Sequence, residues 1–122
     1  MQAKHRGTTH HYAGLAAEDI VSRDYACRGG KVVHRRWRGS GGEIDLIARD
    51  GDQVIFIEVK KSRTFGQAAH RLSRRQMDRI CSAATEFLGG EPRGQLTDIR
   101  FDLALVDGQG AVQIIENAFG EG

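Results

Sequence analysis

Asp45, Glu58 and Lys60 lie inside two runs of the sequence that otherwise read as buried β-strand. Both runs are rich in Ile, Val, Leu and Phe, residue types that favour strands. Between them stands Asp50-Gly51, which is typical of a tight type I′ hairpin turn. The two runs are therefore predicted to pair as an antiparallel hairpin that carries these charges.

The register of this hairpin decides whether the charged groups meet. A two-residue turn at Asp50-Gly51 sets Asp45 opposite Phe56 and places Glu58 diagonal to Asp45. Diagonal neighbours on one face lie roughly 7–8 Å apart at the backbone, so two carboxylates can close onto one cation. Lys60 shares the face of Glu58, because side chains alternate along a strand with a period of two.

Two carboxylates and an ammonium on one strand face suit metal-dependent phosphodiester hydrolysis. Divalent ions activate the attacking water and neutralise the leaving oxygen, and Mg²⁺ is usually held by one or two carboxylates together with waters and phosphates. Asp45 and Glu58 are the candidate ligands, and the Val59 carbonyl is a third. Lys60 is expected to orient the water or to stabilise transition-state charge. Glu43, opposite Glu58 in the predicted register, is an additional candidate.

The alternative is that these charges cover the solvent face of an edge hairpin, where they oppose aggregation. The residues before Glu58 are apolar on both faces of the strand, which favours a central position in a sheet. The predicted register also brings the charges together rather than scattering them.

The rest of the chain supplies the elements that must position this hairpin. Helices are predicted at residues 13–25 and 72–88, strands at 31–38, 100–106 and 112–116, a glycine-rich loop at 39–42, and no regular structure at 61–70. The order α-β-β-β-α-β-β predicts an α/β fold with a mixed β-sheet flanked by helices. The helix between the hairpin and the later strands allows a crossover, which would make strand 100–106 parallel to the strand of Glu58.

Basic residues gather in three stretches of a nearly neutral chain. Lys and Arg number 18 against 16 Asp and Glu, a net charge of +2, which is too small for a strongly basic protein. The stretches at 31–38, 60–63 and 71–79 are either a positive face for nucleic acid or ordinary solvated surface. The outer face of helix 72–88 is predicted to carry the candidate phosphate contacts Arg71, Arg74, Arg75 and Arg79.

A chain of 122 residues predicts one domain, placed at 13–119, after a flexible N-terminal segment at 1–12 and before a tail at 120–122. Cys27 and Cys81 form neither a disulfide framework nor a zinc motif, and no apolar run is long enough to cross a membrane. A cytoplasmic location is therefore expected. His10-His11 is either a metal-binding pair or an unliganded pair in a polar segment, and the second interpretation is favoured.

The spacing of Asp45, Glu58 and Lys60 resembles the PD-(D/E)xK nuclease superfamily. A narrower resemblance, to the YraN family of small, largely uncharacterised bacterial proteins, rests on the segments Gly42-Glu43-Ile44-Asp45-Leu46-Ile47, Ile57-Glu58-Val59-Lys60, Arg100-Phe101-Asp102 and Ile115-Glu116-Asn117-Ala118-Phe119. It implies a restriction-endonuclease-like fold, similar to that of archaeal Holliday-junction resolvases, and a structure-selective or nonspecific DNA nuclease.

The resemblance also implies roles for further residues. Glu18 matches the helix acid of the family, and Gln76 matches a glutamine that faces the site. A surface acid and a solvated helix residue are the respective alternatives. Trp37 matches a family aromatic and is interpreted as core rather than as a base-stacking platform. The chain departs from the family pattern at Arg36, where Asn is common, and at Arg75, where Lys is common.

Three functions follow as hypotheses. The first is a Mg²⁺- or Mn²⁺-dependent endonuclease that acts on DNA, branched DNA included. The second is a noncatalytic nucleic-acid-binding domain on the same fold, and metal-dependent cleavage separates the two. The third is a protein-interaction module, which salt-sensitive DNA binding would argue against. DNA is the expected partner, a homodimer is one candidate assembly, and no membrane partner is expected.

Overall fold

The sheet and its helices follow one another in the predicted order. The computed structural model describes residues 13–120, so the predicted N-terminal segment 1–12 and most of the tail lie outside the described residues. The elements are α2 (Ala13–Cys27), β1 (Lys31–Arg38), β2 (Glu43–Asp50), β3 (Gln53–Lys61), α3 (Phe65–His70), α4 (Arg74–Leu88), a 3-10 turn η1 (Gly94–Leu96), β4 (Ile99–Val106) and β5 (Val112–Ile115). The predicted α/β fold class is confirmed.

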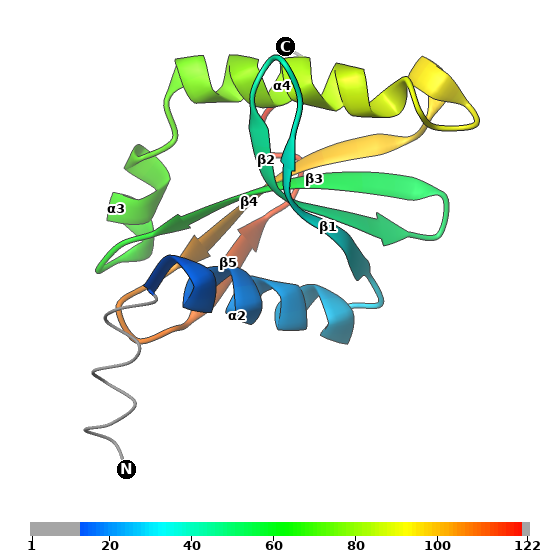
Figure 1. Cartoon of the computed structure of the whole chain (residues 1–122). Helices are drawn as coiled ribbons and strands as arrows, with labels where there is room; N and C mark the ends of the chain where they lie inside the picture. The colour runs from blue at the N-terminus through cyan, green and yellow to red at the C-terminus, as the bar shows by residue number, and fades with distance from the viewer. Residues whose placement is uncertain (1–12, 121–122) are drawn as a thin grey trace.

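The five strands form one mixed sheet in the order β1-β2-β3-β4-β5. Strand β3 pairs parallel to β4, with Glu58 beside Leu103, and the other neighbours are antiparallel. The predicted crossover is therefore confirmed. It runs through α3 and α4 and makes β3 the central strand of the sheet (Figure 1). A central position excludes the edge-hairpin interpretation of Glu58.

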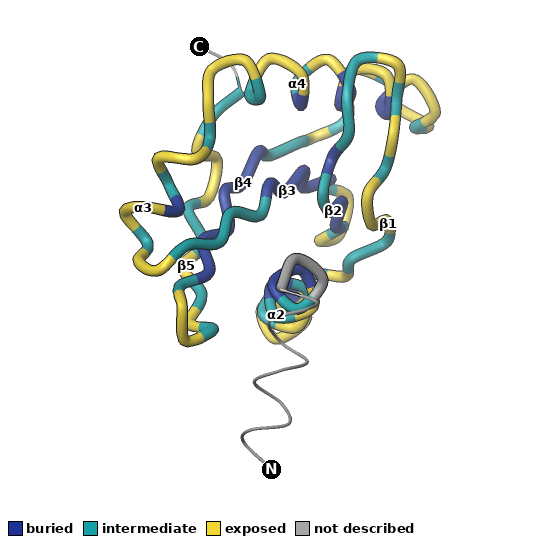
Figure 2. Tube along the Cα trace, turned by 60° about the vertical axis from the view of Figure 1, so that its left-hand side comes forward, coloured by how far each residue is buried: buried dark blue, intermediate teal, exposed yellow. Residues whose placement is uncertain are grey.

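Helices cover both faces of the sheet, and each face has its own core (Figures 1 and 2). Helix α4 packs Ile80 and Phe87 against Phe56 of β3 on one face. Helix α2 packs Val21 and Tyr25 on the other face, against alternate residues of β2, β3 and β4. The apolar β3 run is buried from both sides, as expected of a central strand between helices.

Two features of the crossover segment differ from the prediction. Residues 61–70, expected to be irregular, contain α3, which begins after an N-cap in which Thr64 accepts a hydrogen bond from the Gln67 N–H. Arg71 is the C-cap of α3 and does not belong to the basic helix. Helix α4 begins at Arg74, because Ser73 and Gln76 close a reciprocal capping box there.

The turn of the central hairpin also differs from the prediction. Asp50 pairs with Gln53, so the two turn residues are Gly51 and Asp52 rather than Asp50-Gly51. Only Gly51 of these two has a positive φ, 63°, as in a type II′ turn, where glycine occupies the first central position. The register shifts by two residues, and Phe56 lies opposite Ile47 instead of Asp45. An even shift keeps the side chains of the paired residues, 46–50 and 53–57, on their predicted faces.

Both cysteines, Cys27 and Cys81, are free, which agrees with the absence of a disulfide framework from the sequence. Within residues 13–120, no helix has the length and apolar character needed to span a membrane.

A buried polar network fastens strand β4 to α2. The Asp102 carboxylate is fully buried and accepts hydrogen bonds from the Tyr25 hydroxyl (2.6 Å) and from the backbone N–H of Asn117 (2.9 Å). Arg100 donates to both of its oxygens, at 2.8 and 2.9 Å. The phenol pKa of Tyr25 is raised by burial and by this hydrogen bond. The network links α2, β4 and the segment after β5.

We predict that Asp102→Ala lowers the free energy of unfolding by about 3–5 kcal/mol, because it removes the buried carboxylate that pairs with Arg100 and leaves this largely buried charge only the longer ion pair with Glu116, at 3.7 Å. Asp78→Ala is the matched control, since Asp78 is exposed and lies 3.8 Å from Arg74. This control is expected to change stability by no more than about 0.5 kcal/mol. Urea denaturation measures both values, and equal losses would contradict the structural role of the network.

Candidate active site

Strands β2 and β3 separate at the point where the charged residues stand. Their pairing runs from Asp50–Gln53 to Leu46–Ile57 and ends there. Beyond that pair β2 continues along β1, and β3 continues along β4 as far as Lys61. Asp45 and Glu58 are the first residues beyond the last pair, so their side chains border the gap that opens between the two strands.

Asp45 reaches across this gap. One of its carboxylate oxygens accepts a hydrogen bond of 2.8 Å from the backbone N–H of Val59. The N–H and C=O of one strand residue point toward the same neighbouring strand. The Val59 carbonyl is therefore directed into the gap as well, while its neighbours Glu58 and Lys60 direct their backbone groups toward β4. The Asp45 carboxylate and the Val59 carbonyl, two of the three predicted oxygen donors, thus border the same gap.

Glu58 and Lys60 are in direct contact, with 3.2 Å between the Lys60 Nζ and a carboxyl oxygen of Glu58. Both side chains are largely buried, with exposed fractions of 9% for Glu58 and 15% for Lys60. Burial, and then the negative charge of Asp45, raise the pKa of Glu58 to about 8, and Lys60 opposes the shift. A cation bound nearby would favour the ionised form of such a carboxyl group and would lower its pKa.

Glu18 joins the site from α2. It is 6% exposed, and its carboxylate lies 3.3 Å from the Arg36 guanidinium of β1. Burial raises the pKa of Glu18, the Arg36 charge lowers it, and the Asp45 charge raises it. Glu18 and Asp45 also line the same cavity. Glu18 is thus a buried acid of the site and not the surface acid of the alternative interpretation.

A cavity of about 540 Å³ contains nearly all of the residues proposed from the sequence. The predicted residues that line it are Glu18, Glu43, Asp45, Glu58, Val59, Lys60, Arg71, Gln76 and Arg79. They come from α2, β2, β3, α4 and the cap of α3, so the fold brings together residues that are more than fifty positions apart.

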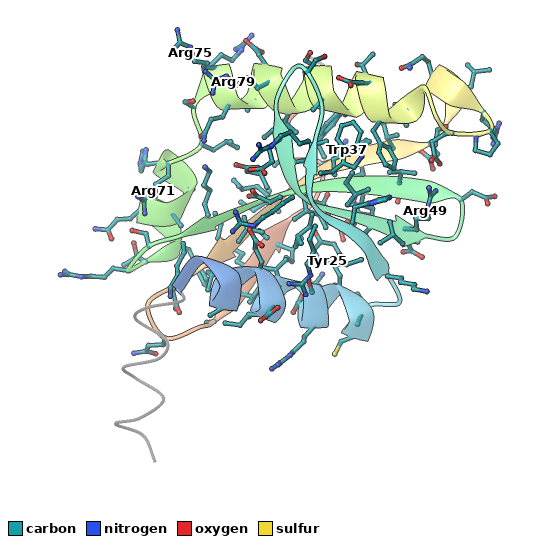
Figure 3. The ribbon with its side chains drawn as sticks, in the orientation of Figure 1. Tyr25, Trp37, Arg49, Arg71, Arg75 and Arg79 are labelled. Carbon is teal, nitrogen blue, oxygen red and sulfur yellow. The ribbon has the colours of Figure 1, made fainter. Side chains whose placement is uncertain are left out.

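Other predicted residues lie elsewhere or have a second role. Arg74 and Arg75 do not line the cavity, and Arg75 extends from the N-terminal end of α4 away from the sheet (Figure 3). Gln76 lines the cavity, but its side chain oxygen also accepts the Ser73 N–H of the capping box. Trp37 packs in the α4 core, edge-on to Phe87 with 5.3 Å between ring centroids, which confirms the core interpretation.

Glu43 is not opposite Glu58, because of the register correction. It pairs with Arg38 across the β1–β2 hairpin, at 3.4 Å, and lines the rim of the cavity. Two further basic residues, Arg36 and Lys61, line the cavity and were not predicted as site residues. The strand pattern could have indicated Lys61, because β3 continues past Lys60 and ends at this residue. Arg36 was noted only as a departure from a family pattern.

The chemistry of these donors fits a divalent cation of the Mg²⁺ type. Among residues 13–120, no group of three or more His, Cys, Asp or Glu side chains is arranged as a metal site. Mg²⁺ does not require such a group, because it keeps several waters and commonly takes one or two carboxylates. Asp45, Glu58 and the Val59 carbonyl would hold the ion, and positive charge there would favour ionisation of Glu58.

We predict that Glu58→Gln stabilises the metal-free protein increasingly as the pH rises from 5 to 8. The unfolded chain loses the Glu58 proton near pH 4.5, whereas the folded protein keeps it until about pH 8. The free energy of unfolding of the parent therefore falls across this window, by up to about 1.4 kcal/mol per pH unit from this group. Glutamine is neutral throughout and does not contribute this loss.

Thermal or urea unfolding at several pH values in EDTA measures the difference. Glu43→Gln is the matched control, since it makes the same chemical change on the cavity rim, and its pH dependence is expected to follow that of the parent. A Glu58→Gln curve parallel to the parent curve would show that Glu58 ionises normally.

Comparison with known proteins places the chain in a family. The model of the uncharacterised protein family UPF0102 matches residues 17–106, which include every acidic residue of the site and Lys60. A UPF0102 protein of Ruegeria pomeroyi is 62% identical over 96% of this chain and 95% of its own length. One from Cereibacter sphaeroides is 66% identical over 93% and 97%, and one from Dinoroseobacter shibae is 46% identical over 92% and 84%. The chain therefore belongs to the UPF0102 family.

Proposed function

We propose that this protein is a metal-dependent DNA endonuclease that hydrolyses phosphodiester bonds with Mg²⁺ or Mn²⁺. The observation that carries the proposal is the meeting of Asp45, Glu58 and Lys60 where β2 and β3 separate, inside a cavity that has basic residues at its edge. Their order along the chain resembles that of the PD-(D/E)xK nucleases, and the sheet with helices on both faces is compatible with that superfamily.

Each group has a distinct part in this proposal. The bound cation would supply a polarised water and positive charge at the leaving oxygen. The Val59 N–H fixes one oxygen of Asp45 at the gap, next to Glu58. Lys60 has no lone pair when protonated and so does not bind the metal. Its ammonium stands beside Glu58, where it can hold negative charge that develops on the phosphate in the transition state.

The cations at the edge of the cavity support a phosphate-bearing substrate. Arg36, Lys61, Arg71 and Arg79 line the same cavity as the carboxylates. The Arg71 guanidinium donates a hydrogen bond of 2.9 Å to the backbone carbonyl of Lys61. This bond ties the Arg71 side chain to the end of β3. Buried carboxylates beside more exposed basic residues suit the joint binding of a metal ion and a polyanion.

The second candidate is a nucleic-acid-binding domain that uses the same basic residues without turnover. The burial of Glu58 and Lys60 argues for the enzyme, because a binding surface alone does not need a carboxylate held at a raised pKa behind the phosphate contacts. A reducing cytoplasm and a homodimer remain predictions from the sequence.

We predict that Lys60→Ala reduces metal-dependent DNA cleavage by on the order of 10²–10³, the loss expected for one preorganised electrostatic donor. DNA binding should change little, since a single ammonium inside the cavity adds few phosphate contacts. Lys60→Arg should restore little activity, because a planar guanidinium does not reproduce a compact charge. The substrates are linear, single-stranded and four-way-junction DNA, each with Mn²⁺ or with EDTA.

Arg63→Ala is the control, since it removes an exposed positive charge just beyond β3 and should cleave at the parent rate. A parent protein that cleaves none of these DNAs with metal would favour the binding-domain hypothesis. Equal rates for the parent and Lys60→Ala would remove Lys60 from the mechanism.

We predict that the double variant Arg71→Ala/Arg79→Ala flattens the dependence of log DNA affinity on log salt by about two units, because each lost phosphate contact releases roughly one counterion fewer. Arg74→Ala/Arg75→Ala removes the same charge from residues outside the cavity and is the matched control. Fluorescence anisotropy between 50 and 300 mM salt measures both slopes. A larger change in the control would place the DNA on the outer face of α4.

A further inference from the structure

Strand β1 changes faces at Arg36. Arg35 lies on the α2 side, where its guanidinium donates to Asp19 at 2.7 Å and to Ser22 at 3.2 Å. Trp37, two residues later, packs on the opposite side, against Phe87 of α4. Residues two apart in a regular strand share a face. The alternation therefore breaks between them, at Arg36.

Strand β2 makes the same change at Asp45. Leu46 belongs to the α2 core, whereas Ile44 belongs to the α4 core. The pairs Arg35–Leu46 and Trp37–Ile44 keep one register, which sets Arg36 directly opposite Asp45. The two irregular residues are cross-strand partners. Because both strands turn over at this pair, the Asp45 side chain points along the sheet, toward Val59, instead of into either core.

The backbone of Arg36 accounts for the turnover. Its φ is 52°, in the left-handed region that residues other than Gly, Asn and Asp seldom adopt. Such a conformation persists where its surroundings hold it in place. Here the guanidinium is held by the ion pair with Glu18 on α2, and Trp37 anchors the next residue in the α4 core.

We propose that Arg36 is a positioning residue whose left-handed backbone aims the Asp45 carboxylate at Val59 and so builds the cation site. The role belongs to the backbone conformation, and the guanidinium of Arg36 serves to hold that conformation through Glu18. The role of Arg36 in a cation site rests on the proposed nuclease function. Its effect on the position of Asp45 does not depend on cleavage or on metal.

The test separates backbone conformation from charge. Arg36→Gly and Arg36→Asn remove the guanidinium and tolerate a positive φ, whereas Arg36→Ala and Arg36→Val remove the same charge and disfavour it, Val most strongly. Arg35→Val is the control for a lost charge at the neighbouring, regular position. The readout is the Val59 amide in ¹H–¹⁵N NMR spectra of the metal-free protein, through its chemical shift and its hydrogen-exchange protection.

We expect the Val59 amide to keep its parent shift and protection in Arg36→Gly, Arg36→Asn and Arg35→Val. In Arg36→Ala its protection should fall about tenfold, because Ala has the same left-handed penalty as Arg but lacks the Glu18 ion pair that offsets this penalty in the parent. Arg36→Val should show a larger loss, and Arg36→Ala decides the question if Arg36→Val does not fold. Two results would overturn the proposal. In the first, the shift and protection of the Val59 amide change equally in all four Arg36 variants, so that they depend on the lost charge. In the second, they are unchanged in Arg36→Ala. Absence of DNA cleavage in the parent would leave this result unaffected and would count only against the nuclease.

Discussion

The separation of β2 from β3 beyond the Leu46–Ile57 pair is the constraint on which the site depends. A continuous sheet in the same register would set Ile44 opposite Val59 and pair the backbone groups of these two residues. Because β2 follows β1 and β3 follows β4, the gap between them admits a carboxylate that bonds the Val59 N–H and directs the adjacent carbonyl toward the same space. The cavity, its oxygen donors and its basic edge all lie at this gap.

The buried charges of the site work against the stability of the metal-free fold. Glu18 and Glu58 both have raised pKa values, chiefly through burial, and each also responds to the charge of Asp45. The chain offsets this repulsion with two cations, Lys60 beside Glu58 and Arg36 beside Glu18. Both cores are apolar, and the polar groups of the Asp102 network are paired. These parts of the fold therefore supply the free energy of folding that offsets the cost of burying the charges of the site. Perturbed carboxylates in a cavity are typical of functional sites.

Local patterns in the sequence predicted the elements well, because strands and helices follow periodicity and glycine signals. The sequence predicted that Asp45 and Glu58 lie near each other, and both line one cavity, but the route differs: Asp45 reaches toward β3 where the two strands have separated and does not share a regular strand face with Glu58. Helix α3 was missed because six mostly small or polar residues carry no amphipathic pattern. The place of Arg36 was not predictable from local patterns, because its conformation depends on contacts with Glu18 and with the α4 core, which only the folded chain provides.

Titration of the protein with Mn²⁺ by isothermal calorimetry tests the central claim most directly, since metal binding at the gap precedes any catalysis. At pH 8 the parent is expected to bind Mn²⁺, and Asp45→Asn, which keeps the size of the side chain but removes its charge, should bind at least about tenfold more weakly. Asp78→Asn removes the same charge from an exposed position on α4 and should match the parent. A parent that does not bind Mn²⁺, or an Asp45→Asn variant that binds it equally well, would contradict the assignment of a cation site to the gap between β2 and β3.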